Sequence, residues 1–154
     1  MKKYIPKIIF GVLLVSAFLS VWFENQTQAQ KENVVTDRVG TIHVKLTGIS
    51  KKEGDLMVGL FRNKKEFLVS PFKGRILPVT GTQEEVVFEK VPYGDYAVSV
   101  IQDLNKNRKL DFFMVFPSEP WGLSNNVKPM GPPQFEPCKF ILDSPHKTLS
   151  IDIH

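Results

Sequence analysis

The chain has 154 residues, enough for one domain, with a net charge of +4 and a single cysteine, Cys138. One cysteine excludes an intramolecular disulfide, so the fold must be stabilised by its apolar core. The small charge, with no basic run interleaved with aromatic residues, argues against a nucleic-acid-binding protein.

Residues 1–29 predict a signal peptide. Three lysines precede an apolar run over residues 8–23, and Thr27 and Ala29 supply the small residues suited to cleavage before Gln30. An uncleaved membrane anchor is the alternative, because the run is slightly long for a signal core, although a span usually needs about 20 residues. The sequence predicts an exported protein, periplasmic or secreted, that touches a membrane only through an uncleaved N-terminal segment.

Residues 30–39 are polar and aperiodic and predict a linker, followed by one β-domain over residues 40–154. Residues 41–47 alternate between apolar and polar side chains, which indicates a strand with one wet face that includes His43. Residues 56–61 are apolar on both faces and predict a central strand. We expect a hairpin to join these two strands.

The middle of the chain predicts two further strands. Residues 62–72 are expected to hold a helical turn, and residues 76–79 an edge strand, since Pro78 is tolerated only at a sheet edge. Residues 84–89 alternate again, with Val86 and Phe88 facing inward.

Residues 91–111 hold the most informative stretch. A turn at Pro92 and Gly94 leads into a strand that buries Tyr96, Val98 and Val100. Two short strands at residues 139–142 and 148–153, with a turn over residues 143–146 between them, end the chain. The pattern of about seven short strands, without a long helix, predicts an all-β fold: an antiparallel immunoglobulin-like or prealbumin-like β-sandwich.

The segment after the central strand has the ligand spacing of a calcium loop. Asp103, Asn105, Asn107 and Asp111 offer side-chain oxygens at near-alternating positions, and Lys109 offers its backbone carbonyl. Hard cations such as Ca²⁺ take several oxygen ligands at once. The alternative is an Asx-rich turn whose side chains cap backbone N–H groups without a metal. The role is structural in either case.

Two residues depart from the calcium-loop pattern. Arg108 occupies the position of the sharp turn, where Gly is usual, and a left-handed conformation there costs roughly 1 kcal/mol. Met114 stands where a bidentate Glu would close the site, so a further oxygen must come from elsewhere, with Glu119 the nearest acidic residue. With two carboxylates, the site is expected to bind Ca²⁺ weakly, with a Kd of roughly 0.1–1 mM.

Residues 112–137 contain six of the chain's 11 prolines and several aromatic residues, which predicts an ordered functional loop. Trp121, Ser124, Asn125 and Asn126 combine an aromatic platform with hydroxyl and amide groups, a mixture suited to small-molecule, sugar or peptide recognition. The alternative is that Trp121 plugs the end of the sandwich while the asparagines bond turn backbone.

Catalytic signatures are missing from the sequence. The three histidines belong to no recognisable motif, and Cys138 is expected to pack as a small hydrophobic residue. Paired carboxylates such as Asp111 and Glu119 could in principle perform acid–base chemistry. The sequence predicts no enzyme, and an envelope hydrolase is the least favoured alternative.

The segments YAVSVIQDLNKNRKLD, EPWGLSNN and GPPQF, in this order before two terminal strands, resemble the bacterial family called domain of unknown function 2141. The resemblance covers about residues 40–153 and implies a small exported β-sandwich protein, with no catalytic residues to transfer. About 20 residues also resemble prealbumin-like and collagen-adhesin B-type modules, in which a similar loop often holds calcium.

These patterns together predict a non-catalytic exported protein that serves as a binding or accessory module of the cell envelope. Its expected cofactor is at most a weakly bound structural Ca²⁺, and its expected partner is an envelope or extracellular ligand. The alternative function is small-molecule or glycan binding by the loop from Trp121 to Asn126.

Overall fold

The computed structural model describes residues 38–114 and 116–154. The predicted signal peptide, its cleavage point and nearly all of the predicted linker lie outside these residues. Val39–His154 form one compact unit with its own hydrophobic core, which is the property that lets a domain fold by itself. In the part of the chain that the structure describes, no helix is long and apolar enough to cross a membrane.

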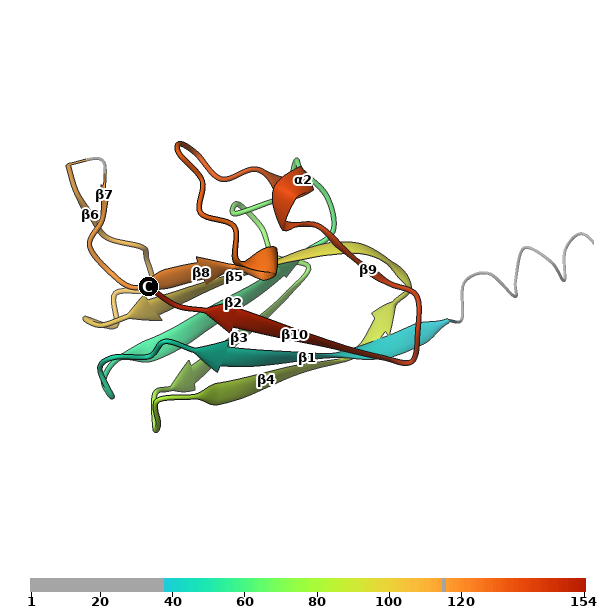
Figure 1. The fold of residues 1–154 in the computed structure, drawn as a ribbon, viewed down its shortest axis with the longest axis horizontal. Coiled ribbons are helices and arrows are strands. Elements are labelled where there is room, and N and C mark those ends of the chain that lie inside the picture. Colours follow the sequence, from blue (N-terminus) through green and yellow to red (C-terminus); the bar gives the residue numbers. More distant parts are fainter. Residues whose placement is uncertain (1–37, 115) are drawn as a thin grey trace, which may run out of the picture. The chain divides into compact units, whose positions relative to one another are not determined.

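Two sheets build the domain (Figure 1). The first has the strand order β10-β1-β4, and the second has the order β3-β2-β5-β8, with β9 paired to the opposite end of β5 from β8. The strands are β1 (Val39–Thr47), β2 (Asp55–Phe61), β3 (Lys73–Pro78), β4 (Glu84–Pro92), β5 (Gly94–Asp103), β8 (Trp121–Leu123), β9 (Phe140–Leu142) and β10 (His146–Asp152).

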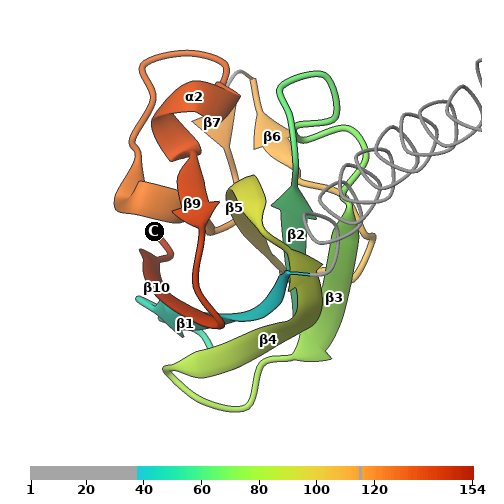
Figure 2. The same cartoon turned by 90° about the vertical axis from the view of Figure 1, so that its right-hand side faces the viewer.

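The core lies between the two sheets, which face each other in Figure 2. The inward residues follow the period of two read from the sequence: Ile42, Val44 and Leu46 in β1, and Val98 and Val100 in β5, are all fully buried. Each such side chain contributes about 1.5–3 kcal/mol by leaving water. The predicted all-β sandwich is therefore confirmed.

A second, smaller cluster lies on the other side of β5. It consists of Phe61, Phe67, Ala97, Leu123, Phe135 and Cys138, with Trp121 and Val127 packed against it. This cluster explains why β5 is apolar on both faces: residues of one parity face the sandwich core and those of the other parity face the long C-terminal loop. Cys138 packs as a small hydrophobic residue, as expected.

The remaining elements are short. They are the two-stranded hairpin β6 (Phe112–Phe113) and β7 (Phe116–Pro117), the 3₁₀ turn η1 (Ser124–Asn126) and the single-turn helix α2 (Phe135–Cys138). Strand β3 lies at a sheet edge, as Pro78 predicted, and β2 lies between β3 and β5, as its two apolar faces predicted. The described residues form the strands β1 to β10, which is more than the number of about seven that the sequence predicted.

The predicted hairpin between the first two strands is wrong. β1 pairs with β4 and β10, and β2 pairs with β3 and β5, so residues 48–54 cross from one sheet to the other. A seven-residue connection does not dictate strand pairing as a tight two-residue turn does. One pair, β1 with β10, is parallel, although the sandwich was expected to be antiparallel throughout.

One local prediction is also corrected. Residues 143–146 do not join two paired strands, because β9 pairs with β5 and β10 pairs with β1; His146 is the first residue of β10 rather than part of a turn. Residues 62–72, where a helical turn was expected, form consecutive turns in which the N–H groups of Val69 and Ser70 donate to the Glu66 carbonyl, at 3.0 and 2.9 Å. There Asn63 accepts the N–H groups of Lys65 and Glu66, at 3.0 and 3.1 Å, and so orders the turn locally.

Candidate functional site

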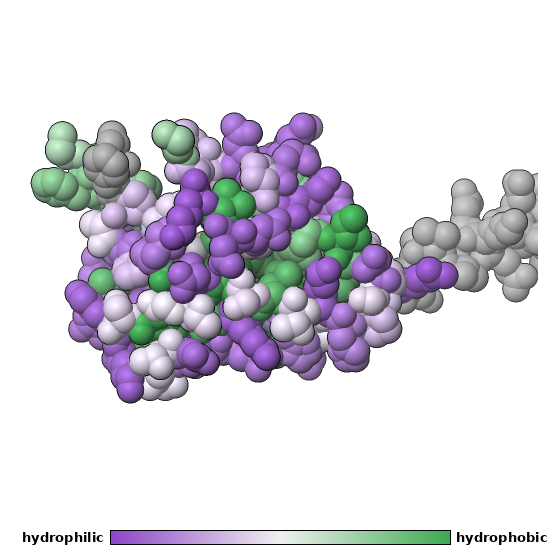
Figure 3. Space-filling model, viewed as in Figure 1, coloured by the Kyte–Doolittle hydropathy of each residue, from purple (hydrophilic) through white to green (hydrophobic). Residues whose placement is uncertain are grey.

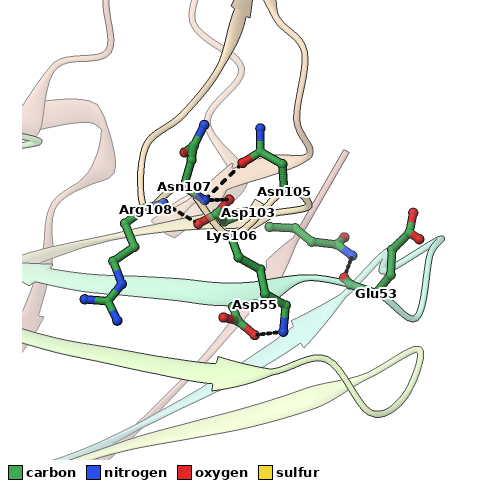
Figure 4. Close-up of polar contacts among 8 residues, drawn as sticks. Glu53, Asp55, Asp103, Asn105, Lys106, Asn107 and Arg108 are labelled. Atoms are coloured by element: carbon green, nitrogen blue, oxygen red, sulfur yellow. Dashed lines mark hydrogen bonds and ion pairs between the residues drawn. The ribbon is translucent and has the colours of Figure 1, made fainter.

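The Asx loop, residues 103–111, begins with a buried carboxylate at the end of β5. Asp103 is 1% exposed. Its two carboxylate oxygens accept the backbone N–H groups of Asn107, at 3.1 Å, and of Arg108, at 2.6 Å (Figure 4). These bonds fold the loop back over its first residue, because hydrogen bonds to an ionised acceptor are the stronger kind.

The other Asx side chains converge within the same loop. The Asn105 and Asn107 amide nitrogens both donate to Oδ2 of Asp111, at 2.6 and 2.8 Å. The amide oxygen of Asn105 accepts the Asn107 N–H, and that of Asn107 accepts the Lys109 N–H, at 3.0 and 2.8 Å. These bonds bring the side chains of Asn105, Asn107 and Asp111 together beside Asp103, and Lys109 takes part here through its N–H.

The loop has the sharp turns that a calcium loop needs. Arg108 has a φ of 62°, the left-handed conformation expected at its position, and Lys106 has a φ of 61°. The Lys106 ammonium lies 3.0 Å from the Asp55 carboxylate and joins the loop to β2 (Figure 4). Left-handed residues other than Gly are costly, so the side-chain bonds of Asp103 must offset this strain.

Glu119 holds both ends of the Asx loop. It is 6% exposed, and its carboxylate accepts the N–H of Leu104 at 2.9 Å and that of Asp111 at 3.1 Å. The sequence singled out Glu119 only as a nearby acidic residue, and its structural role was missed. Nothing in the sequence indicates that a glutamate from the following loop accepts hydrogen bonds from both ends of the Asx loop.

Gln102 is a second residue that the sequence analysis missed. It is fully buried and donates its amide to the carbonyls of Lys51, at 2.8 Å, and Glu53, at 2.9 Å. The sequence did contain a signal. Gln102 follows Tyr96, Val98 and Val100 at alternate positions of the same strand, so it is a polar residue at a position that faces the core. It fixes the connection between the sheets beside the Asx loop.

The oxygens of this loop fit a hard cation chemically, since two carboxylates, two amides and a main-chain carbonyl are ligands of the kind Ca²⁺ prefers. Within residues 38–114 and 116–154, no cluster of three His, Cys, Asp or Glu side chains is arranged to hold a metal. A cation at the Asx loop would therefore depend on the asparagine and main-chain oxygens beside Asp103 and Asp111.

The polar residues predicted for ligand recognition connect three elements. Ser124 is fully buried, accepts the Val98 N–H at 2.9 Å and donates to the Cys138 carbonyl at 2.5 Å. These bonds attach η1 to β5 and to the end of α2, so the Ser124 hydroxyl is enclosed by backbone.

Asn125 and Asn126 extend the same connection. Asn125 donates to the carbonyls of Pro137 and Lys139, at 3.0 and 2.9 Å. Asn126 accepts the Asp152 N–H at 2.8 Å and donates to the Ser150 carbonyl at 3.3 Å, which attaches η1 to β10. The asparagines therefore bond the backbone of α2 and β10 and not that of a turn.

Trp121 is half-buried. It packs against the second hydrophobic cluster, and its ring lies 5.7 Å from that of His154. His43 lies on the outer face of the first sheet, where its Nδ1 is 3.0 Å from the Glu85 carboxylate and its ring is 6.2 Å from that of His146. His43 and His146 belong to β1 and β10 of the first sheet, whereas the Ser124 hydroxyl bonds β5 and the end of α2.

Comparison with protein families gives one match. The family described as an uncharacterized protein conserved in bacteria, domain of unknown function 2141, matches residues 44–150, which span the domain from β1 to β10. Neither the search of curated proteins nor the search of solved structures returned a match. Because the match covers well over half of the sequence, the chain belongs to the family called domain of unknown function 2141.

Proposed function

We propose that the protein is an exported, non-catalytic β-sandwich that serves as an accessory module of the cell envelope, and that its Asx loop binds one structural Ca²⁺. The observation that carries the calcium assignment is the convergence of Asn105, Asn107 and Asp111 beside the buried Asp103. Rotation of each amide would exchange its nitrogen for an oxygen, so the same side chains could turn acceptors toward a cation.

With Ca²⁺ bound, Asp103, Asn105, Asn107, Asp111 and the Lys109 carbonyl would hold the ion. A bound Ca²⁺ would neutralise the negative charges of Asp103 and Asp111. It would also fix the loop between β5 and the β6–β7 hairpin. The ion would thus contribute stability and order, with no chemical step.

The environment of the nucleophilic side chains supports a non-catalytic role. The Ser124 hydroxyl is enclosed by backbone partners, and burial raises the pKa of the Cys138 thiol, which keeps it protonated and unreactive. Activation of either residue needs a base within hydrogen-bond reach. His43 is paired with Glu85 on the outer face of the other sheet.

A thermal unfolding experiment tests the calcium site. The midpoint of residues 30–154 is measured in EDTA and in several mM CaCl₂, for the wild type, Asp111→Asn and the control Asp143→Ala in the exposed turn before β10. We expect a calcium-dependent gain of about 1–2 kcal/mol, or several degrees, in the wild type and the control. Asp111→Asn should lose this gain, and a wild-type midpoint that does not change between EDTA and CaCl₂ would contradict the assignment.

Export is tested separately. The full chain is expressed in a bacterium, the cell fractions are separated, and the N-terminus of the recovered protein is sequenced. A chain that begins at Gln30 in the periplasm or medium supports the proposal. A full-length chain that stays in the cytoplasm would contradict it.

A further inference from the structure

Exposed apolar side chains are concentrated in three loops. Six of the nine exposed large hydrophobic residues among those described belong to residues 62–72, the β6–β7 hairpin with the residue that follows β6, and residues 127–134: Leu68, Val69, Phe112, Phe113, Met114 and Met130. Figures 1 and 2 share a vertical axis, and all three segments reach the upper end of the domain in both views. We call these six side chains the apolar tips.

The hairpin carries the largest part of this surface. Phe112, Phe113 and Met114 are 58%, 72% and 83% exposed, and Figure 3 shows a hydrophobic cluster that projects where the hairpin leaves the domain. Its base is fixed, since the Ser118 N–H donates to the Asp111 carbonyl at 2.9 Å. A fixed hairpin that holds adjacent aromatic side chains in water is expected to have a partner that covers them.

The loop over residues 62–72 is built in the same way. Phe67 is buried in the second cluster and anchors the loop, while the next residue, Leu68, adopts a left-handed φ of 59°. Val69 follows and is 81% exposed. In the third loop, Met130 is fully exposed. The hairpin and the loop over residues 62–72 therefore each combine a held base with an apolar tip.

Cations accompany the tips on two of the three loops. Lys64 and Lys65 lie in the first loop and Lys128 in the third, and Arg108 and Lys109 precede the hairpin in the Asx loop. All five are exposed, and none forms an ion pair within residues 38–114 and 116–154. In the loop over residues 62–72 the one acidic residue, Glu66, is paired with Arg62, whereas Asp111 beside Arg108 and Lys109 accepts only neutral asparagine amides and keeps its negative charge. The uncompensated charge of residues 62–72 and 127–134 is therefore positive.

We infer that the apolar tips insert into the interface of an anionic lipid bilayer while the flanking cations contact its head groups. Apolar and aromatic side chains next to Lys and Arg are the combination by which peripheral proteins bind membranes. The tips project from three separate loops, a shape that a fluid bilayer accommodates without a matching partner surface. The folded domain would thus contact the membrane independently of the N-terminal segment.

Vesicle co-sedimentation tests this inference. Residues 30–154 lack the apolar N-terminal run, which would bind lipid by itself, and retain the compact unit Val39–His154. The vesicles contain either phosphatidylglycerol with phosphatidylethanolamine or phosphatidylcholine alone, and EDTA is present throughout. We expect binding to the anionic vesicles, and binding about fivefold weaker for each cation removed in Lys64→Gln and Lys65→Gln, which lie in the loop over residues 62–72.

The decisive variant carries Phe112→Ser, Phe113→Ser and Met114→Ser, and its matched control carries Ile76→Ser and Ile141→Ser, which change two exposed isoleucines on β3 and β9. The hairpin variant should bind at least about tenfold more weakly than the wild type, and the control should bind equally well. Circular dichroism checks that both variants fold.

Two results would overturn the inference: a wild type that does not bind anionic vesicles, or a hairpin variant that binds as the wild type does. Because EDTA removes calcium, failure here leaves the proposed calcium site intact, and failure of the calcium site leaves the lipid contact intact.

Discussion

Trp121 and His154 exchange both of their backbone hydrogen bonds, at 3.2 and 3.1 Å. Trp121 begins β8 of the second sheet, and His154 follows β10 of the first. Gly122 permits this approach, because a Cβ there would lie 2.8 Å from the Asp152 carbonyl oxygen and from the Ile151 side chain. The two sheets of the sandwich are therefore joined through backbone at this corner.

The first prediction concerns the contribution of this corner to the free energy of unfolding. Ile153 is 1% exposed, so Ile153→Ala should lower the free energy of unfolding by about 2–4 kcal/mol through lost burial and a residual cavity. Urea denaturation measures the change. The matched control Ile141→Ala removes an isoleucine that is 54% exposed and should cost less than about 0.5 kcal/mol. Equal effects in the two variants would show that the corner is not part of the cooperative core.

The buried hydroxyl of Ser124 gives a second prediction. Ser124→Ala leaves the Val98 N–H and the Cys138 carbonyl without this partner and should cost about 1–3 kcal/mol in chemical denaturation. Ser70→Ala changes an exposed serine in a loop and serves as the control. A loss at Ser124 no greater than at Ser70 would mean that water replaces the hydroxyl and that the connection is weaker than the distances imply.

The buried carboxylate of Glu119 gives a third prediction about stability. Glu119→Gln keeps the shape of the side chain but replaces one carboxylate oxygen by an NH₂ group, which would face a backbone N–H at Leu104 or Asp111. We expect a loss of about 1–3 kcal/mol in unfolding free energy. Glu89→Gln, on the exposed side of β4, is the control and should be nearly neutral. The role assigned to Glu119 is wrong if both variants unfold at the wild-type urea concentration.

The turn before β4 gives a pH dependence. The hydroxyl and N–H of Thr80 and the N–H of Gly81 donate to the Glu84 carboxylate, and they hold its pKa below the ordinary value of 4.5. A lowered folded-state pKa contributes stability above the unfolded-state pKa, and this contribution is lost as the pH falls through the folded-state value.

Glu84→Gln should therefore destabilise the protein at pH 7, by at most about 1 kcal/mol because the group lies near the surface. The difference from the wild type should shrink as the pH falls from about 4.5 toward 3. Thermal midpoints of both proteins across this range measure it. A difference that stays constant with pH would contradict the assignment.

The sequence predicted the strands well because their signal is local. Ile42, Val44 and Leu46 show the period of two that a half-buried strand requires, and the structure buries all three. Strand partners carry no comparable signal. Thr41 lies opposite His146, and nothing near either residue identifies the other, so the parallel pair of β1 and β10 could not be foreseen.

In the candidate site, too, the local features were predicted and the tertiary contacts were missed. The spacing of Asp103, Asn105 and Asn107 predicted a loop with converging polar side chains, and Arg108 takes the left-handed conformation expected at its position. The support from Glu119 was missed because it depends on tertiary placement. The apolar tips were also missed, since Phe112 and Phe113 resemble core residues until the fold leaves them outside.

The pairing of the first strand with the last determines when this protein can fold. β1 is the first strand of the domain to leave the ribosome, but one of its two neighbours, β10, spans His146–Asp152. The first sheet therefore cannot be completed until synthesis is almost finished, and contacts so distant in sequence form slowly. A product truncated before β10 would expose the edge of β1 to aggregation and proteolysis.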